Sequence, residues 1–364
     1  MESLDVIQFG DCYRGSRVLV TGHTGFKGSW LAYWLNELGA QIAGISLDPE
    51  TQPNHWDQLG LSIDDQRFDI RDADSVKAAV EKFRPRIVFH LAAQPLVRRS
   101  YREPIDNWST NVMGTAHVLE ACRHVESVQA VVAITTDKVY ANHERTKGYR
   151  ESDRLGGHDP YSASKAACEL LIDSYRNAFF SDEDAPLLAS ARAGNVIGGG
   201  DWSEDRLIPD LVRSVTDHES LLIRSPHATR PWQHVLECLA GYLLLGQRLL
   251  ERRREFAEAW NFGPGSEANR TVTEILTSLQ AHWPDLEWEQ AQSAQPHEAS
   301  LLYLDIAKAN KLLGWQPVWS LDQALKLTAD WYRQFHEQGA TATGGQLATY
   351  VADARSAGAG WVSE

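Results

Sequence analysis

A tyrosine and a lysine four residues apart, Tyr161 and Lys165, form the most informative chemical pattern in the sequence. Pro160 suits the first position of a helix and Asp159 suits the capping position before it, so both side chains should lie on one helical face. An ammonium beside a phenol stabilises the phenolate, which lowers the pKa of the tyrosine towards the range of a general base. The alternative is a helix with a surface lysine and a partly buried tyrosine.

A second polar cluster follows an apolar run that begins at Ala130. The run reads as a buried strand, and Thr136, Asp137 and Lys138 come directly after it. Because the carboxyl end of a strand in an open α/β sheet faces the ligand crevice, these side chains should meet Tyr161 there. The Thr136 hydroxyl then hydrogen-bonds the substrate oxygen that Tyr161 deprotonates. The alternative is a simple polar turn.

Glycines at 22, 25 and 28 lie between a strand-like run, Arg17 to Thr21, and an amphipathic helix. Such glycines let the backbone turn sharply and approach a pyrophosphate, and the following helix presents free N–H groups to the phosphates. The spacing differs from G-x-G-x-x-G but serves the same geometry. Because further strand–helix units follow, we interpret the loop as a dinucleotide-binding site and not as a structural turn.

The second strand ends at Asp48, near the usual distance for a carboxylate that binds the adenine ribose. No arginine or lysine stands there to meet a 2′-phosphate, so NAD is favoured over NADP. The alternative for Asp48 is a solvent-exposed turn before Pro49. Asp69 and Ile70 end the third strand, where they would flank the adenine.

The elements that position these residues alternate between strand and helix up to about residue 193. This alternation predicts an α/β fold with a Rossmann-type, doubly wound parallel sheet covered by helices on both faces. We expect residues 1–192 and 234–262 to form this domain, and residues 193–233 and 263–338 to form a smaller, mainly helical subdomain. Residues 339–364 lack clear apolar periodicity and are expected to form a flexible tail.

The 364-residue chain has 35 basic and 49 acidic residues, a formal net charge of −14. That average field argues against nucleic acid or an anionic membrane as the main partner. The four cysteines lack the spacing of a zinc site, and we expect no metal. With no signal sequence and no apolar run near twenty residues, a cytoplasmic protein is expected.

Several longer segments resemble the extended short-chain dehydrogenase/reductase family, and within it the nucleotide-sugar 4,6-dehydratases. The resemblance covers roughly residues 14 to 335 and is greatest to the branch that acts on CDP-glucose. The glycine and Tyr/Lys motifs identify only the superfamily, whereas the later segments are more specific. The segments that carry the resemblance are Val20 to Gly28, Phe89 to Arg98, Asn111 to Thr115, Arg192 to Trp202, and Arg230 to Val235.

The family implies a reaction in three stages. Tyr161, aided by Lys165 and Thr136, removes the C4 hydroxyl proton while the C4 hydride passes to NAD. The C4 ketone acidifies the C5 proton, and water leaves from C6 with Asp137 as the acid. The hydride then returns to C6. Related enzymes have a glutamate base where this chain has Lys138. Either Lys138 is the C5 base, or it stabilises the enolate as an ammonium while a different residue is the base. Lys27 either shares this role or is a solvated lysine.

The resemblance also assigns binding residues and a partner. The substrate is expected to contact Gln94, Asn195, Arg224 and Arg230, with Arg192 in the wall below. The helices around 112–125 and 161–179 are expected to pair in a four-helix bundle, giving a homodimer or higher homo-oligomer. The cofactor-binding residues are expected to be Gly22, His23, Thr24, Gly25, Phe26, Lys27, Gly28, Asp48, Asp69, Ile70, Leu91, Ala92, Ala93, Thr135, Tyr161 and Lys165.

Three other functions compete with dehydration of CDP-glucose. A nucleotide-sugar 4-epimerase would share Tyr161, Lys165 and NAD, but it needs no acid for water loss, and the Asp137–Lys138 pair therefore disfavours it. A 4,6-dehydratase for another nucleotide-activated hexose would use the same residues. A non-catalytic dinucleotide-binding regulator could lose Thr136, Tyr161 and Lys165, yet all three are present.

Overall fold

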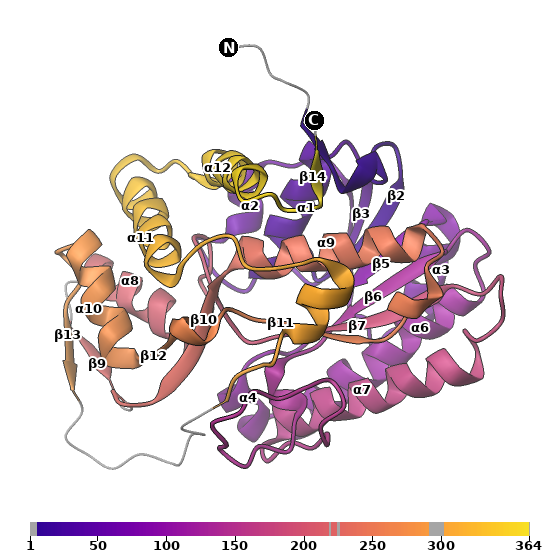
Figure 1. The fold of residues 1–364 in the computed structure, drawn as a ribbon, viewed down its shortest axis with the longest axis horizontal. Helices are drawn as coiled ribbons and strands as arrows, with labels where there is room; N and C mark the ends of the chain where they lie inside the picture. Colours follow the sequence, from indigo (N-terminus) through magenta and orange to yellow (C-terminus); the bar gives the residue numbers. More distant parts are fainter. Residues whose placement is uncertain (1–5, 218–219, 224–225, 291–301, 364) are drawn as a thin grey trace.

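The computed structural model describes residues 6–217, 220–223, 226–290 and 302–363, and its centre is a seven-stranded parallel sheet (Figure 1). The strand order is β11-β7-β6-β5-β2-β3-β4. The chain runs from β2 outward to β4, returns to β5 beside β2, and then runs to the other edge. The order therefore reverses between β2 and β5, which places a ligand crevice at their carboxyl ends. The bounds are β2 Arg17–Thr21, β3 Gln41–Ser46, β4 Asp64–Arg67, β5 Ile87–His90, β6 Ala130–Ile134, β7 Leu187–Ala193 and β11 Ala259–Phe262.

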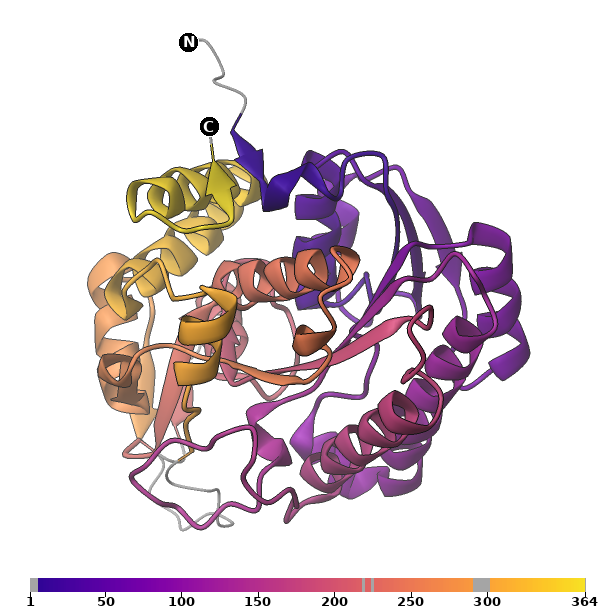
Figure 2. The same ribbon diagram turned by 45° about the vertical axis from the view of Figure 1, so that its right-hand side comes forward.

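Helices cover both faces of the sheet, as predicted (Figure 2). Val18 and Val20 of β2 pack towards one face, whereas Leu19 packs towards the other, because successive strand residues point to opposite sides. Both faces are apolar, as a buried parallel sheet requires. One face packs on α1 (Phe26–Glu37) and α9 (Val235–Leu250). The other packs on α3 (Ala73–Phe83), α6 (Gly114–Arg123) and α7 (Pro160–Ala178).

Smaller sheets and helices follow β7. One three-stranded sheet has the order β12-β10-β8, with β8 at Asn195–Ile197, β10 at Thr229–His234 and β12 at Asn269–Thr271. A second sheet pairs β9 (Leu221–Ile223) with β13 (Trp288–Gln290). The helices of this region are α8 (Leu207–Asp217), α10 (Val272–His282) and α11 (Leu321–Gln338). None of the described helices is long and apolar enough to cross a membrane.

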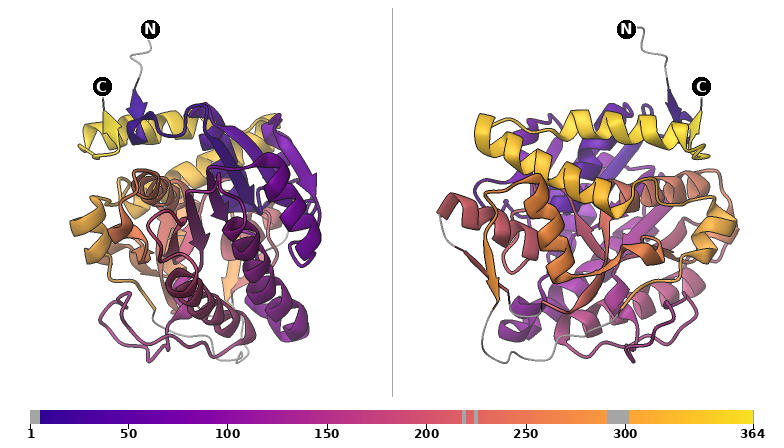
Figure 3. Two further views of the ribbon diagram at one scale, coloured as in Figure 1. Left: turned by 90° about the vertical axis from the view of Figure 1, so that its right-hand side faces the viewer. Right: turned by 60° about the vertical axis from the view of Figure 1, so that its left-hand side comes forward.

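The expectation of a flexible tail is wrong for the described residues. Thr343–Ser356 form α12, and Val362–Ser363 form β14, which pairs with β1 (Ile7–Gln8) and brings the first and last described strands together (Figure 3). Leu347, Tyr350, Val351 and Ala354 are buried, at helical spacing. Small residues precede the apolar stripe, so the sequence does not predict this helix. It does not predict β14 either, because the partner strand, β1, lies at the other end of the sequence.

A buried carboxylate anchors this C-terminal helix to the core. Glu237 of α9 accepts hydrogen bonds from the backbone N–H groups of Val318 and Trp319 and from the Tyr350 hydroxyl, at 3.0, 2.7 and 2.8 Å. Burial raises the pKa of Glu237 from 4.5 to about 7, although the three donors act in the opposite direction. One side chain therefore links α9, the segment before α11 and α12.

Replacing Glu237 with glutamine should remove a pH dependence of stability. Because the pKa is higher in the folded chain than in the unfolded chain, the folded state binds the proton more tightly, and this stability is lost as pH rises through about 7. The shift corresponds to about 3 kcal/mol between roughly pH 4 and pH 8. Urea unfolding across this range should show a smaller decline in the free energy of unfolding for Glu237→Gln. An equal decline in both proteins would refute the assignment.

Candidate active site

The glycine-rich loop lies at the carboxyl end of β2, beside the end of β5. Gly22 has a φ of 76°, and a Cβ there would lie 2.7 Å from the Ala92 nitrogen. A Cβ on Gly28 would lie 2.0 Å from the Gly22 oxygen. Both positions therefore require glycine. Helix α1 begins just after Gly25 without a side-chain cap, so its first N–H groups can receive an anion. The loop fits a dinucleotide pyrophosphate.

Two further residues of the loop fasten it to the sheet. The His23 ring is buried, and its Nε2 lies 2.8 Å from an Asp65 oxygen. Thr24 Oγ1 donates to the Leu47 carbonyl and lies 2.6 Å from Ser46 Oγ. These side chains hold the loop against β3 and β4.

The structure places an unforeseen arginine near the end of β3. The Asp48 side chain is 88% exposed, and its carboxylate lies 4.0 Å from Arg67 of β4. Arg67 also donates to the Leu47 carbonyl and to Asp65. The sequence near Asp48 contains no basic residue, so only strand pairing brings this guanidinium there.

The remaining residues expected around the dinucleotide lie at neighbouring strand ends. Asp69 forms an ion pair of 2.7 Å with Arg71. Ile70 is buried, and a Cβ on Gly114 of α6 would clash with it. Leu91, Ala92 and Ala93 follow β5, where the Ala92 nitrogen donates to Thr21 Oγ1.

The structure brings the predicted catalytic residues of β6 and α7 together. Asp159 caps α7 by accepting from the Ser162 nitrogen at 2.9 Å, and Pro160 occupies the first turn, as expected. Lys165 Nζ donates to the carbonyl of Ile134, the last residue of β6, at 3.1 Å. Thr136 lies close enough to the Tyr161 phenol to oppose the rise that burial causes in the pKa of this phenol. The end of β6 and the first turns of α7 therefore share one site.

The expected lowering of the Tyr161 pKa is not what the structure shows. Burial raises the pKa of this phenol to about 12, and the Thr136 hydrogen bond opposes the rise. Burial also lowers the pKa of Lys165, whose ammonium is directed at the Ile134 carbonyl. Helical spacing alone placed both groups on one face but did not show that desolvation dominates.

Two lysine side chains, Lys138 and Lys27, lie near Asp137. Its Oδ1 accepts from the Thr136 hydroxyl at 2.9 Å and from Lys138 Nζ at 3.1 Å. Lys138 Nζ also lies 3.5 Å from the Asn195 amide oxygen. Burial lowers the pKa of Lys27, which senses the charges of Asp137 and Lys138. Lys27 is therefore not a fully solvated lysine, and an acid and two amines meet in one crevice.

The residues expected to bind the substrate are only partly gathered in this crevice. Asn195 begins β8 and approaches Lys138, whereas the Gln94 amide oxygen accepts from the nearby Leu96 nitrogen and from the Asn107 side chain of α5 (Pro104–Trp108). Arg230 lies on β10 and donates to the Thr229 carbonyl. Arg224 lies outside the described residues.

Two residues near the site were not predicted as functional. Arg206 donates to Asp201 at 2.9 Å, and its charge lowers the pKa of Tyr161. The Asn111 amide donates to Ser164 of α7 and accepts from the Gln94 nitrogen. The segment Asn111 to Thr115, which carries the family resemblance, could have pointed to Asn111. Arg206 lies in a loop that belongs to no recognised motif.

The fold and the site together define a Rossmann-type α/β protein of the extended short-chain dehydrogenase/reductase class. The chain belongs to the GDP-mannose 4,6-dehydratase family, whose model matches residues 19–328.

Relatives and solved structures agree with this membership. The chain is 48% identical over 328 residues to CDP-glucose 4,6-dehydratase of Salmonella typhimurium, covering 88% of this chain and 91% of the relative. The structure of dTDP-glucose 4,6-dehydratase from Streptomyces venezuelae with bound NAD has a TM-score of 0.74 at 26% identity. The match covers 88% of this chain and 98% of that chain. UDP-glucose 4-epimerase from Thermotoga maritima, at 23% identity and a TM-score of 0.76 with 88% and 99% coverage, shares the fold.

Proposed function

We propose that this protein is an NAD-dependent 4,6-dehydratase that converts CDP-glucose into CDP-4-keto-6-deoxyglucose and water. The observation that carries the proposal is the meeting of Thr136, Asp137 and Lys138 with Tyr161 and Lys165 at the crevice of the sheet. The 48% identity to the Salmonella enzyme supports the choice of CDP-glucose. Residues 193–233 and 263–338 would hold the nucleotide sugar, with Asn195 and Arg230 near its phosphates.

The glycine loop and the uncapped start of α1 would hold the pyrophosphate of NAD, and Lys165 would donate to the nicotinamide ribose. When bound, NAD supplies the hydride acceptor for oxidation of C4 and the hydride donor for reduction of C6. The chain's own residues move the protons. Tyr161, as the phenolate, takes the proton of the C4 hydroxyl and becomes a neutral phenol, and Thr136 orients the substrate oxygen.

Asp137 donates the proton that lets the C6 hydroxyl leave as water. The structure offers two amines for the C5 proton: Lys138, which is paired with Asp137, and Lys27, whose pKa burial lowers. Exchange of the C5 hydrogen with deuterated water identifies the base, since the variant that lacks it loses the exchange. Lys27→Met and Lys138→Met form a matched pair for this measurement.

The proposal is tested by incubating the enzyme and NAD with CDP-, dTDP-, GDP- and UDP-glucose. Mass detection should show loss of one water from CDP-glucose at the highest rate, and the product should show the alkaline absorbance of a 4-keto sugar. Recovery of only a C4 epimer would reject dehydration. A higher kcat/KM with another nucleotide would reject the choice of CDP.

We also propose that the protein forms a homodimer through the helical face around α6 and α7. Large apolar side chains are exposed on this part of the surface: Ile105 of α5 (Pro104–Trp108), Met113, and Leu170 of α7. Exposed apolar groups on neighbouring helices are typical of an interface. A four-helix bundle made by two copies would cover them.

Leu170→Glu should therefore convert the dimer into a monomer, because it places a charge in the apolar interface. Light scattering after size-exclusion chromatography measures the mass. The matched control is Leu312→Glu, since Leu312 is 63% exposed and Leu170 is 64% exposed. A dimer that persists in Leu170→Glu, or a monomeric wild type, would contradict the proposed interface.

A further inference from the structure

A buried carboxylate that the proposed chemistry does not use, Glu169, lies on the catalytic helix. Tyr161, Lys165 and Glu169 are spaced by four residues, so they follow one face of α7. Glu169 is only 4% exposed. Ionised groups are rarely buried to this extent unless they are paired and hydrogen-bonded.

Glu169 joins the catalytic helix to the two strands beneath it. Its carboxylate accepts from the hydroxyl of Thr135, which directly precedes Thr136, at 2.5 Å. On the neighbouring strand β7 it accepts from Ser190 at 2.8 Å and from Arg192 at 2.7 Å. These partners lower the pKa of Glu169 against the effect of burial. One carboxylate therefore fixes the end of β6 and strand β7 relative to α7.

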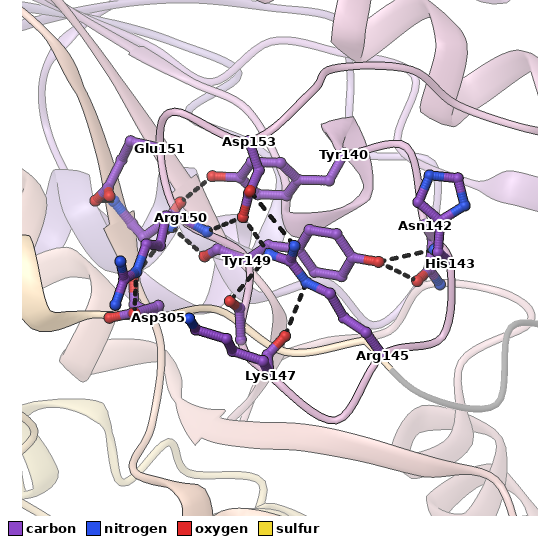
Figure 4. Close-up of polar contacts among 12 residues, drawn as sticks. Tyr140, Asn142, His143, Arg145, Lys147, Tyr149, Arg150, Glu151, Asp153 and Asp305 are labelled. Atoms are coloured by element: carbon purple, nitrogen blue, oxygen red, sulfur yellow. Dashed lines mark hydrogen bonds and ion pairs between the residues drawn. The ribbon is translucent and has the colours of Figure 1, made fainter.

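Arg192 links Glu169 to the segment that connects the end of β6 with α7. Its guanidinium is buried beside Glu169 and donates to the Tyr140 hydroxyl at 2.8 Å and to the Glu151 carbonyl at 3.1 Å. Tyr140 stacks on Tyr149 (Figure 4). Residues 140–151 lie in the segment that connects Thr136, Asp137 and Lys138 with Tyr161. Arg192 therefore holds this connection and does not line the substrate wall that the sequence suggested.

We propose that Glu169 and Arg192 form a positioning pair that holds Tyr161 and Lys165 of α7 against Thr136 of the β6 end. The inference rests on the proposed dehydratase function and deepens it. Neither residue touches the reacting atoms; both act through hydrogen-bonded neighbours. A buried ion pair demands a fixed geometry of its partners, which an apolar contact does not.

The pair also acts on the charge of Lys165. The Glu169 carboxylate raises the pKa of this lysine, whereas burial and Lys27 of α1 lower it. Further titratable or charged neighbours among the described residues include Tyr161 and Cys168 on α7, His90 on β5 and, behind Glu169, Arg192 on β7. Removing the carboxylate would leave Arg192 unpaired, and the Lys165 pKa should fall.

Glu169→Gln tests the proposal. We expect kcat for CDP-glucose to fall about 10- to 100-fold, because small misplacements of catalytic groups carry such costs, while KM changes less than about twofold. The alkaline limb of the pH profile of kcat/KM should move to lower pH, since Lys165 loses its proton more easily. Glu169→Asp should restore part of the lost kcat and move the alkaline limb of the pH profile part of the way back towards its wild-type position.

Two further variants separate positioning from folding. Glu237→Gln is the matched control, because Glu237 is equally buried but its partners lie away from α7; it should leave kcat and the alkaline limb unchanged. Glu169→Gln/Arg192→Met removes both charges, so it avoids the unpaired guanidinium if the single variant does not fold. The double variant should fold, bind substrate with normal KM and retain the low kcat.

The outcomes distinguish this inference from the proposed function. A wild type that does not dehydrate CDP-glucose overturns the proposed function. An active wild type with a Glu169→Gln variant of normal kcat and unchanged alkaline limb overturns the positioning pair. If Glu169→Gln does not fold, a Glu169→Gln/Arg192→Met variant with normal kcat also overturns the positioning pair.

Discussion

Tyr161→Phe should lower kcat about 10²- to 10⁴-fold while leaving NAD binding intact. Tyr161, in its phenolate form, is the group that takes the proton of the C4 hydroxyl, and general acid–base catalysis contributes a factor of this size. Phenylalanine fills the same volume in a buried position, so the helix and the crevice should persist. The Thr136 hydroxyl alone would still orient the substrate but would not remove its proton.

The measurement is the rate of 4-keto product formation, with NAD affinity determined by calorimetry on the same preparation. Tyr175→Phe is the matched control, because Tyr175 lies on the same helix but bonds Glu120 away from the crevice. The control should keep the wild-type rate. A Tyr161→Phe enzyme within threefold of the wild type would exclude the phenol as the base.

Gly28→Ala should reduce NAD affinity at least about 100-fold, or about 3 kcal/mol. A Cβ at this position would lie 2.0 Å from the Gly22 oxygen and 2.8 Å from the His23 Cα, and backbone atoms cannot yield as a flexible side chain would. The turn must therefore open, which displaces both the loop and the first N–H groups of α1 from the pyrophosphate.

Binding is measured by titrating NAD into each purified protein. Gly345→Ala is the control for the same change elsewhere, since a Cβ there would meet no atom within 4 Å outside its own stretch of helix, and α12 should tolerate or prefer alanine. Wild-type NAD affinity in Gly28→Ala would show that the loop does not bind the dinucleotide as inferred.

The sequence predicted the inner strands of the central sheet because these strands obey local rules, whereas the edge strand β4 is a polar segment, Asp64–Arg67, that follows no apolar pattern. Strands such as β2 and β6 are short apolar runs, and helices such as α3 and α7 carry caps and an amphipathic pattern that fix their type and limits. The α/β alternation then restricts the topology, which places Thr136 near Tyr161 at the crevice. These parts depend on neighbours in sequence or on general rules of chain connection.

The parts that could not be predicted depend on contacts between distant segments. Arg67 reaches Asp48 only because β4 pairs with β3, and Arg192 is oriented by Glu169 and Tyr140. The rise in the Tyr161 pKa follows from burial by the whole fold. The C-terminal segment is ordered by β1 and Glu237, neither of which is close to it in sequence.

If the crevice oxidises C4 with bound NAD, the hydrogen removed from C4 should return to C6 of the same sugar. The most direct measurement uses CDP-glucose carrying deuterium at C4, with the position of the label in the product read by nuclear magnetic resonance. The label is expected at C6 of the 4-keto-6-deoxy product. Label lost to solvent, or kept at C4 of an unchanged or epimerised sugar, would contradict the mechanism.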